Sequence, residues 1–381
     1  MSAPLVRAGR RAAHATACAG LLVAVGCSTA TSGRGTPVLD VGGLRVVGTT
    51  SVDARTGRLS PDGASISLES EDKLCFRAMS GGDTCTTRGD HDNTFAGSWS
   101  PDGSRYVTTE PYFLRFVDPD IEVIDTSSGE VTDLTDDGVT GSRLARRRGG
   151  FVDLWPSWSG DGTAIRFART KEPDGAVQLC SVAAAGGKLT VLGQLAGTTM
   201  GRLGALVFSA DGTTVYWTKD ATASRGTVYS QAVDGSTARA LVEPRKGLDR
   251  SLLSLSADGR YLLVSSQAPE STDSTPRVAG PTDAEVIDLR SHTPTPVAGG
   301  HNVHGPTWSP AGHALASIAS PTAKQLRAGG TGALMVTAEP GLTGRKLRSG
   351  RFYAPDMREV GWSSGAMLVG LDDHLAVLTV S

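Results

Sequence analysis

Several features that mark other classes of protein are scarce in this sequence. Aromatic residues make up only 5% of its 381 residues, and there is no excess of positive charge. At a formal net charge of −2 the chain lacks the basic surface used to bind nucleic-acid backbones, so we expect no nucleic-acid partner. After one early segment no run of about 18 apolar residues occurs, which excludes a polytopic membrane protein. An apolar share of 39% can still fill a core, and 48 glycines and 19 prolines predict many tight turns.

Recognisable catalytic motifs are also missing. The sequence contains no C-x-x-C pair, no P-loop and no G-x-G-x-x-G following an expected strand. The pattern G-x-S-x-G occurs at residues 361–365, but there it belongs to the last turn repeat between two expected strands and not to the strand–turn–helix elbow of a hydrolase. No complete set of nucleophile, base and oxyanion donors can be assembled from it. The sequence therefore predicts a protein that is not an enzyme and that needs no cofactor.

The first residues have the layout of an export signal. Residues 1–26 contain Arg7, Arg10 and Arg11, no acidic residue, and then a short apolar run. The run ends in Ala24-Val25-Gly26-Cys27, which resembles a bacterial lipobox with Cys27 as the acylated residue. Residues 27–37 are small and polar, as in a flexible tether. We expect a lipid-anchored protein on the outer face of the cell membrane; if Cys27 is not acylated, the chain is secreted or periplasmic.

A short repeat organises the remaining sequence, residues 38–381. A Ser-x-Asp-Gly tetrapeptide preceded by an apolar residue or tryptophan returns about every 50 residues. The last two copies lack the aspartate, and the seventh is the most degenerate. The copies are LSPDG (59–63), WSPDG (99–103), WSGDG (158–162), FSADG (208–212), LSADG (255–259), WSPAG (308–312) and WSSG (362–365).

The chemistry of the repeat is that of a tight turn between two strands. Aspartate caps such a turn with its side chain, and glycine takes the left-handed position. Each copy lies between strand-like runs, which gives about four strands per unit and predicts an all-β fold, a single β-propeller of four-stranded blades. Seven blades are expected, with six as the alternative. Only two strands fit after Trp362, so we expect residues 44–49 to supply the missing outer strand and close the ring.

The WSPDG-type repeats resemble those of the TolB family of bacterial envelope proteins. The resemblance covers nearly all of residues 44–381 and implies the propeller fold, although a fold of this kind hosts many functions. TolB itself carries an additional α/β domain before its propeller. This sequence leaves no room for one, so the resemblance alone does not imply a role in the Tol system and leaves that question open.

The cysteines separate into different roles. Cys75 and Cys85 flank a turn at residues 79–83, and in an oxidising compartment they are predicted to form a structural disulfide; free thiols are the alternative. Cys180 stands alone in an expected strand and is predicted to be buried packing.

Polar and aromatic residues gather just before several expected inner strands. Residues entering an inner strand line one mouth of a propeller channel, which makes this the candidate face for a partner. Its members are His91, Asp153, Trp155, Asp249, Arg250, His301 and His304. A long connection between blades two and three adds a candidate basic loop with Arg143, Arg146, Arg147 and Arg148.

The leading hypothesis is therefore a non-catalytic, lipid-anchored propeller that binds a protein or another envelope component, such as a glycan, through the channel mouth. The alternative is a metal-dependent lyase or hydrolase acting on a polysaccharide, with His301 and His304 as metal ligands. The simpler interpretation, which we favour over metal binding, is that both are loop histidines that make local hydrogen bonds.

Overall fold

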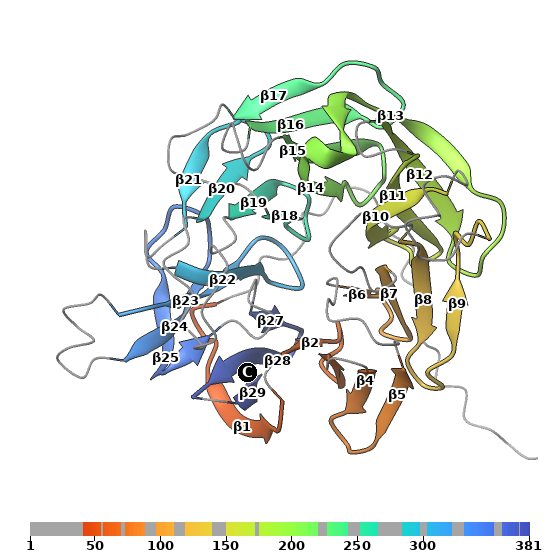
Figure 1. The fold of residues 1–381 in the computed structure, drawn as a ribbon. Helices are drawn as coiled ribbons and strands as arrows, with labels where there is room; N and C mark the ends of the chain where they lie inside the picture. The colour runs from red at the N-terminus through yellow and green to blue at the C-terminus, as the bar shows by residue number, and fades with distance from the viewer. Residues whose placement is uncertain are drawn as a thin grey trace, which may run out of the picture. The chain divides into compact units, whose positions relative to one another are not determined.

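The computed structural model shows an all-β protein. It describes residues 41–54, 56–69, 73–87, 97–109, 119–138, 150–171, 175–219, 227–242, 252–265, 284–297, 303–321, 331–353, 360–372 and 374–381. Over these ranges the strands form seven sheets arranged in a ring (Figure 1). The described helical content is one 3₁₀ turn, η1 (Met200–Arg202), and no helix in these ranges could span a lipid bilayer. The predicted seven-bladed propeller is confirmed, and the six-bladed alternative is wrong.

The first three blades follow one another along the chain, each with antiparallel strands in sequence order. Blade one consists of β2 (Gly57–Leu59), β3 (Ser65–Glu69), β4 (Lys73–Ala78) and β5 (Asp83–Thr87). Blade two consists of β6 (Ser98–Trp99), β7 (Arg105–Thr109), β8 (Ile121–Asp125) and β9 (Val131–Asp133). Blade three consists of β10 (Val152–Trp158), β11 (Ala164–Thr170), β12 (Ala176–Ala183) and β13 (Thr190–Thr199).

The next three blades repeat this order, with the first strand nearest the centre of the ring (Figure 1). Blade four consists of β14 (Leu203–Phe208), β15 (Thr214–Lys219), β16 (Thr227–Ala232) and β17 (Arg239–Val242). Blade five consists of β18 (Leu252–Leu255), β19 (Tyr261–Ser265), β20 (Ala284–Asp288) and β21 (Pro294–Pro296). Blade six consists of β22 (Val303–Trp308), β23 (Leu315–Ala319), β24 (Gly332–Thr337) and β25 (Arg345–Gly350).

Blade seven joins the two ends of the described propeller. Its strands from the end of the chain are β27 (Gly361–Trp362), β28 (Ala366–Leu371) and β29 (His374–Val380), and β26 (Phe352–Tyr353) also pairs with β28. The outermost strand is β1 (Val46–Val52), which runs antiparallel to β29 from Val46 opposite Val380 to Val52 opposite Leu375. The predicted closing strand is therefore present, although it lies at 46–52 rather than 44–49.

The Ser-x-Asp-Gly repeats form the turns between the first two strands of the blades. In blade two the hydroxyl of Ser100 donates to Asp102 Oδ1 (2.6 Å), and the same oxygen accepts the backbone N–H of Ser104 (3.1 Å). Gly103 lies in the left-handed region at φ 73°, which an L side chain rarely adopts. These hydrogen bonds lower the pKa of Asp102 to about 2. The repeated aspartates are thus explained by turn geometry.

The tryptophan that precedes several of these turns links neighbouring blades. The indole N–H of Trp99 donates to the carbonyl of Arg58 (3.2 Å), that of Trp158 to Ser98 (3.0 Å), and that of Trp308 to Ser254 (3.2 Å). In each case the acceptor belongs to the innermost strand of the preceding blade. The indole hydrogen bond therefore connects the inner strands of adjacent blades.

The core is divided into clusters of buried residues between blades. One cluster packs Leu74 and Phe76 of blade one against Trp99, Tyr106 and Ile124 of blade two. Similar clusters join blades two and three, three and four, four and five, five and six, and six and seven. The seventh joins blade seven to blade one and includes Val52 of β1. Apolar burial therefore continues around the whole ring.

Candidate functional site

The structure describes only part of the predicted partner-binding face. Asp153, Trp155 and His304 lie in described segments, whereas His91, Asp249, Arg250 and His301 lie outside them. The candidate basic loop, Arg143, Arg146, Arg147 and Arg148, also lies outside, as does Cys27 with the rest of residues 1–40. These residues remain predictions.

The three described residues lie within inner strands rather than before them. Asp153 and Trp155 belong to β10, and His304 belongs to β22. Both strands begin earlier along the chain than the sequence predicts. A side chain within a packed inner strand can contact a partner only if part of it is exposed. The exposure of Asp153, Trp155 and His304 therefore decides which of them can bind.

Asp153 is buried and cannot contact a partner directly. Its carboxylate has no solvent exposure and accepts two hydrogen bonds from the guanidinium of Arg169, at 2.7 Å from Nε and 2.5 Å from Nη2. Burial raises the pKa of Asp153, and the adjacent guanidinium opposes that shift. We assign the pair as ionised at neutral pH because the bidentate geometry satisfies both charges. Asp153 therefore fixes the position of Arg169.

Arg169 in turn belongs to a group of cationic and aromatic side chains. Its Cζ lies 4.5 Å from the ring centroid of Phe151, and Nζ of Lys171 lies 5.0 Å from the same ring. Lys171 is exposed, while Phe151 is partly exposed. We use the name blade-three patch for these three residues together with Trp155, which lies two residues after Asp153 on β10 and packs against the buried cluster between blades three and four. Phe151, Arg169 and Lys171 were not among the predicted site residues, because no motif connects them before β10 and β11 are paired.

Trp155 has an unusual backbone conformation. Its φ is 56°, in the left-handed region, and it lies in a bulge of β10 between Leu154 and Ser157. Blade six has a bulge in the corresponding place between His304 and Thr307, where Gly305 adopts φ 52° without a side-chain penalty. A bulky residue in this conformation costs roughly 1–3 kcal/mol, and such strain is concentrated at functional sites. Half-buried Trp155 is thus the strongest single indication of a binding residue on this face.

His304 is less suited to binding than expected. Its side chain is buried in β22, opposite Ile318, and burial lowers its pKa so that the imidazole is neutral at pH 7. Among the residues that the structure describes, it belongs to no group of three close metal-ligating side chains. The predicted metal pair of His301 and His304 therefore remains untested, with one member outside the described segments.

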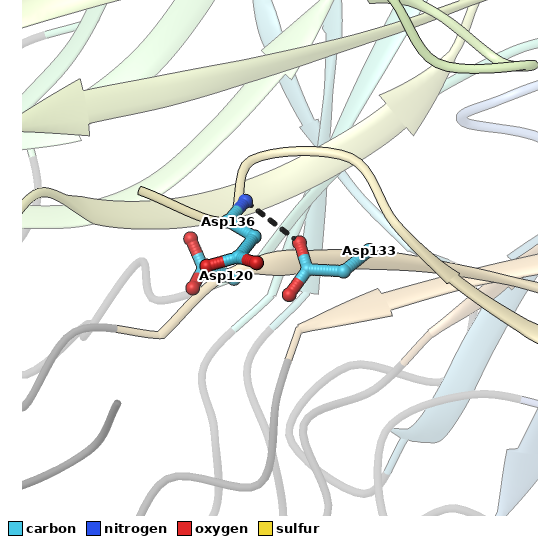
Figure 2. A group of neighbouring side chains, drawn as sticks. All are labelled: Asp120, Asp133 and Asp136. Atoms are coloured by element: carbon cyan, nitrogen blue, oxygen red, sulfur yellow. Dashed lines mark hydrogen bonds between the residues drawn. The ribbon is translucent and has the colours of Figure 1, made fainter. Parts of the chain in front are cut away.

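A group of carboxylates lies where blade two leads into blade three. Oxygen atoms of Asp120, Asp133 and Asp136 lie within 4.8 Å of one another. Figure 2 shows the three side chains next to each other. Asp133 Oδ1 accepts the backbone N–H groups of Thr135 (3.0 Å) and Asp136 (2.9 Å), and Asp120 Oδ1 accepts the hydroxyl of Thr135 (2.9 Å). These carboxylates stabilise the turn after β9. None of the three was among the predicted site residues, since Asp120 precedes β8 and meets the other two only when β8 and β9 pair.

The cysteines of the described propeller are structural. Cys75 of β4 and Cys85 of β5 face each other in register and form a disulfide. Cys180 is buried in β12, and desolvation raises the pKa of its thiol to about 12. A thiol held protonated in this way is a poor nucleophile.

The repeats and the ring together identify the architecture. The fold is a seven-bladed β-propeller. No protein-family model matches the chain, and no curated protein matches it. Solved structures with similar folds include a putative TolB from Agrobacterium tumefaciens, 19% identical with a TM-score of 0.44, over 65% of this chain and 80% of that one.

Two further solved structures extend the comparison. TolB from Acinetobacter baumannii is 15% identical with a TM-score of 0.42, over 85% of this chain and 62% of that one. An oligogalacturonate lyase in complex with manganese is 12% identical with a TM-score of 0.54, over 87% of this chain and 90% of that one. At these identities the similarity is one of fold.

Proposed function

We propose that this chain is a non-catalytic β-propeller, attached through lipid on Cys27 to the outer face of the cell membrane, that binds a protein or glycan of the envelope. The blade-three patch is the proposed contact surface. The observation that carries the proposal is Trp155, a half-buried tryptophan kept in a strained conformation on an inner strand. Tryptophan and arginine are the residues most enriched at binding hot spots.

The chemistry of the patch suggests the chemistry of its partner. Arg169 is fixed by Asp153, and Lys171 is exposed beside the Phe151 ring. Such a surface offers the positive charge of Lys171 next to the flat ring of Phe151. Arg169, with a largely buried side chain, holds that ring in place, so little side-chain entropy is lost on binding. The patch suits a carboxylate-bearing segment with an aromatic or sugar ring.

The test is cross-linking in living cells with the full-length tagged protein, followed by mass spectrometry. Trp155→Gly removes the indole and also the backbone strain, so the propeller should stay folded while capture of the partner falls at least 10-fold. Lys171→Ala should weaken capture less. Lys188→Ala, an exposed lysine of the same blade outside the patch, is the matched control. Undiminished capture by folded Trp155→Gly would refute this choice of surface.

The enzymatic alternative predicts a different result. A metal-dependent lyase or hydrolase, such as the manganese-bound lyase of similar fold, would hold a divalent ion through His301 and His304. Burial of His304 gives this alternative less support. It requires close to one tightly bound divalent ion per purified chain and loss of that ion in His301→Ala. Elemental analysis that finds no such ion in the purified protein would refute the enzymatic alternative.

A further inference from the structure

A second surface lies on the outer circumference of the ring, away from the inner strands. A groove of about 480 Å³ runs between β1 of blade seven and β25 of blade six. These are the outermost strands of their blades (Figure 1). Its walls are residues 44–49 on one side and Arg345, Leu347 and Arg348 on the other. We call it the β1–β25 groove.

The groove is lined with positive charge. Arg45, Arg345 and Arg348 line it, and no acidic residue does. Over the described segments none of these arginines forms a salt bridge with a carboxylate. Exposed Lys346 adds a further cation on β25. An uncompensated set of this kind attracts anions, and arginine binds phosphate oxygens in a bidentate manner.

Two of the arginines are held in place by neutral partners. Arg345 Nη2 donates to the carbonyl oxygens of Val41 (2.7 Å) and Leu44 (2.5 Å), and Arg348 Nη1 donates to Thr49 Oγ1 (2.6 Å). These bonds fix the guanidinium groups at the groove without cancelling their charge. The side chain of Arg45 is exposed.

Exposed aliphatic side chains accompany the charge. Val47, which lines the groove, is 62% exposed, the highest value among the large hydrophobic residues exposed in the described segments. Leu342, three residues before Arg345, is 53% exposed. Cations next to exposed aliphatic groups are typical of surfaces that rest on an anionic bilayer, with the apolar atoms at the acyl boundary.

The position of the groove along the chain also favours a membrane surface as its binding partner. Leu44 follows Cys27 by about 17 residues, and a fully extended chain of that length reaches no more than ~60 Å. An acyl group on Cys27 would therefore hold this edge of the ring within that distance of the membrane, and the tether joins the propeller at this edge. We propose that the β1–β25 groove is the membrane-facing surface of the propeller and binds the phosphate headgroups of anionic lipids. This inference rests on the proposed anchoring for its geometry, but not on the proposed partner.

Vesicle binding tests the inference without the acyl group. The full-length chain with Cys27→Ser is mixed with vesicles of phosphatidylcholine alone, or with vesicles in which about a third of the lipid is phosphatidylglycerol. Residues 1–26 are the same in all variants, so their contribution cancels. We expect tighter binding to the anionic vesicles. Arg45→Gln combined with Arg348→Gln should reduce it about 30-fold, at about five-fold for each cation removed.

The matched control is Lys188→Gln combined with Arg202→Gln, which removes two exposed cations elsewhere and should leave binding unchanged. Unfolding curves of both pairs establish that the loss is not one of folding. Equal binding to both kinds of vesicle, or wild-type binding by the folded groove variant, overturns the inference. So does saturation of the groove by glycerol phosphate in solution, which would make it a site for a free phosphate.

Failure of this inference can be told apart from failure of the proposed function. Acylation of Cys27 is read independently from the mass of the N-terminal peptide of the protein isolated from cells. Partner capture through the blade-three patch does not depend on the groove residues. If the chain fails to bind anionic vesicles but is acylated and still captures its partner, only the proposal for the groove is refuted.

Discussion

At the scale of single residues, two side chains differ from what an ordinary propeller blade needs. Asp153 is a fully buried carboxylate whose charge is balanced by Arg169, and Trp155 keeps a backbone angle that glycine would adopt at no cost. Neither feature is required for a four-stranded sheet. Buried ion pairs seldom increase stability over an apolar pair of similar size, so their presence here indicates positioning of the exposed neighbours.

Asp153→Asn should be strongly destabilising. It leaves a largely buried guanidinium without its counter-charge, and we expect a loss of about 3 kcal/mol in the free energy of unfolding measured with urea. Asp83→Asn is the matched control, because Asp83 and Arg77 form the same two-bond pair at the surface, at 2.8 and 2.7 Å. Its loss should stay below about 1 kcal/mol. Similar losses in the two variants would show that Asp153 acts only as a local hydrogen-bond acceptor.

At the scale of the element, the turn after each inner strand carries the repeat. The hydroxyl of the serine and a backbone N–H converge on one carboxylate oxygen in blades one to five. Blade six has Ala311 at the aspartate position, and there Ser309 donates to the carbonyl of Ala311 instead (2.6 Å). The turn therefore forms without aspartate. The carboxylate is not needed for the fold, but it makes the turn more stable and sensitive to pH.

The turn aspartates should make the propeller sensitive to acid. Hydrogen bonds from serine and backbone lower the pKa of Asp62 and Asp211, and lower those of Asp102 and Asp161 to about 2. A carboxylate whose folded pKa lies below its unfolded value stabilises the fold above about pH 4, and that contribution is lost as the pH falls towards 2. Urea midpoints measured from pH 5 to 2 should fall.

The same series should be flatter for Asp102→Asn combined with Asp211→Asn, which keeps an oxygen acceptor in each turn but removes the titrating group. The double variant should be less stable than wild type at pH 5 and closest to it at pH 2. An identical pH slope in both proteins would assign the acid sensitivity to other carboxylates.

At the scale of the whole molecule, stability depends on the joint between blades seven and one. Each blade pair shares one cluster of buried apolar residues, and the closing cluster depends on Val52, which comes from β1 rather than from the end of the chain. Without β1, blade seven would expose the edge of β29 as well as part of this cluster.

Val52→Asp should therefore open the ring. Val52 is 5% exposed, so the variant places a charge between the two blades and should cost at least 3 kcal/mol. We expect a lower thermal midpoint by circular dichroism and rapid protease cleavage near β1. Thr50→Asp, at an exposed position of the same strand, should behave like wild type. Equal protease resistance in the two variants would mean that β1 is dispensable.

Much of the fold was predictable because its information is local. The Ser-x-Asp-Gly turns can be recognised within five residues, and counting strands after Trp362 sufficed to predict the closing strand. Burial of Asp153 and His304 was not predictable, because it depends on packing of their strands against neighbouring blades. The β1–β25 groove was missed for the same reason, since Arg45 and Arg345 are brought together only by ring closure.

Because β1 pairs with β29, the first strand of the propeller to be synthesised has to wait for the last. About 320 residues separate Val52 from His374, which at ordinary translation rates corresponds to roughly 15 seconds to a minute. During that time a valine-rich strand has no partner in its own blade. An interrupted chain would remain in that state, with an open β edge that a protease can cleave or a second copy can pair with.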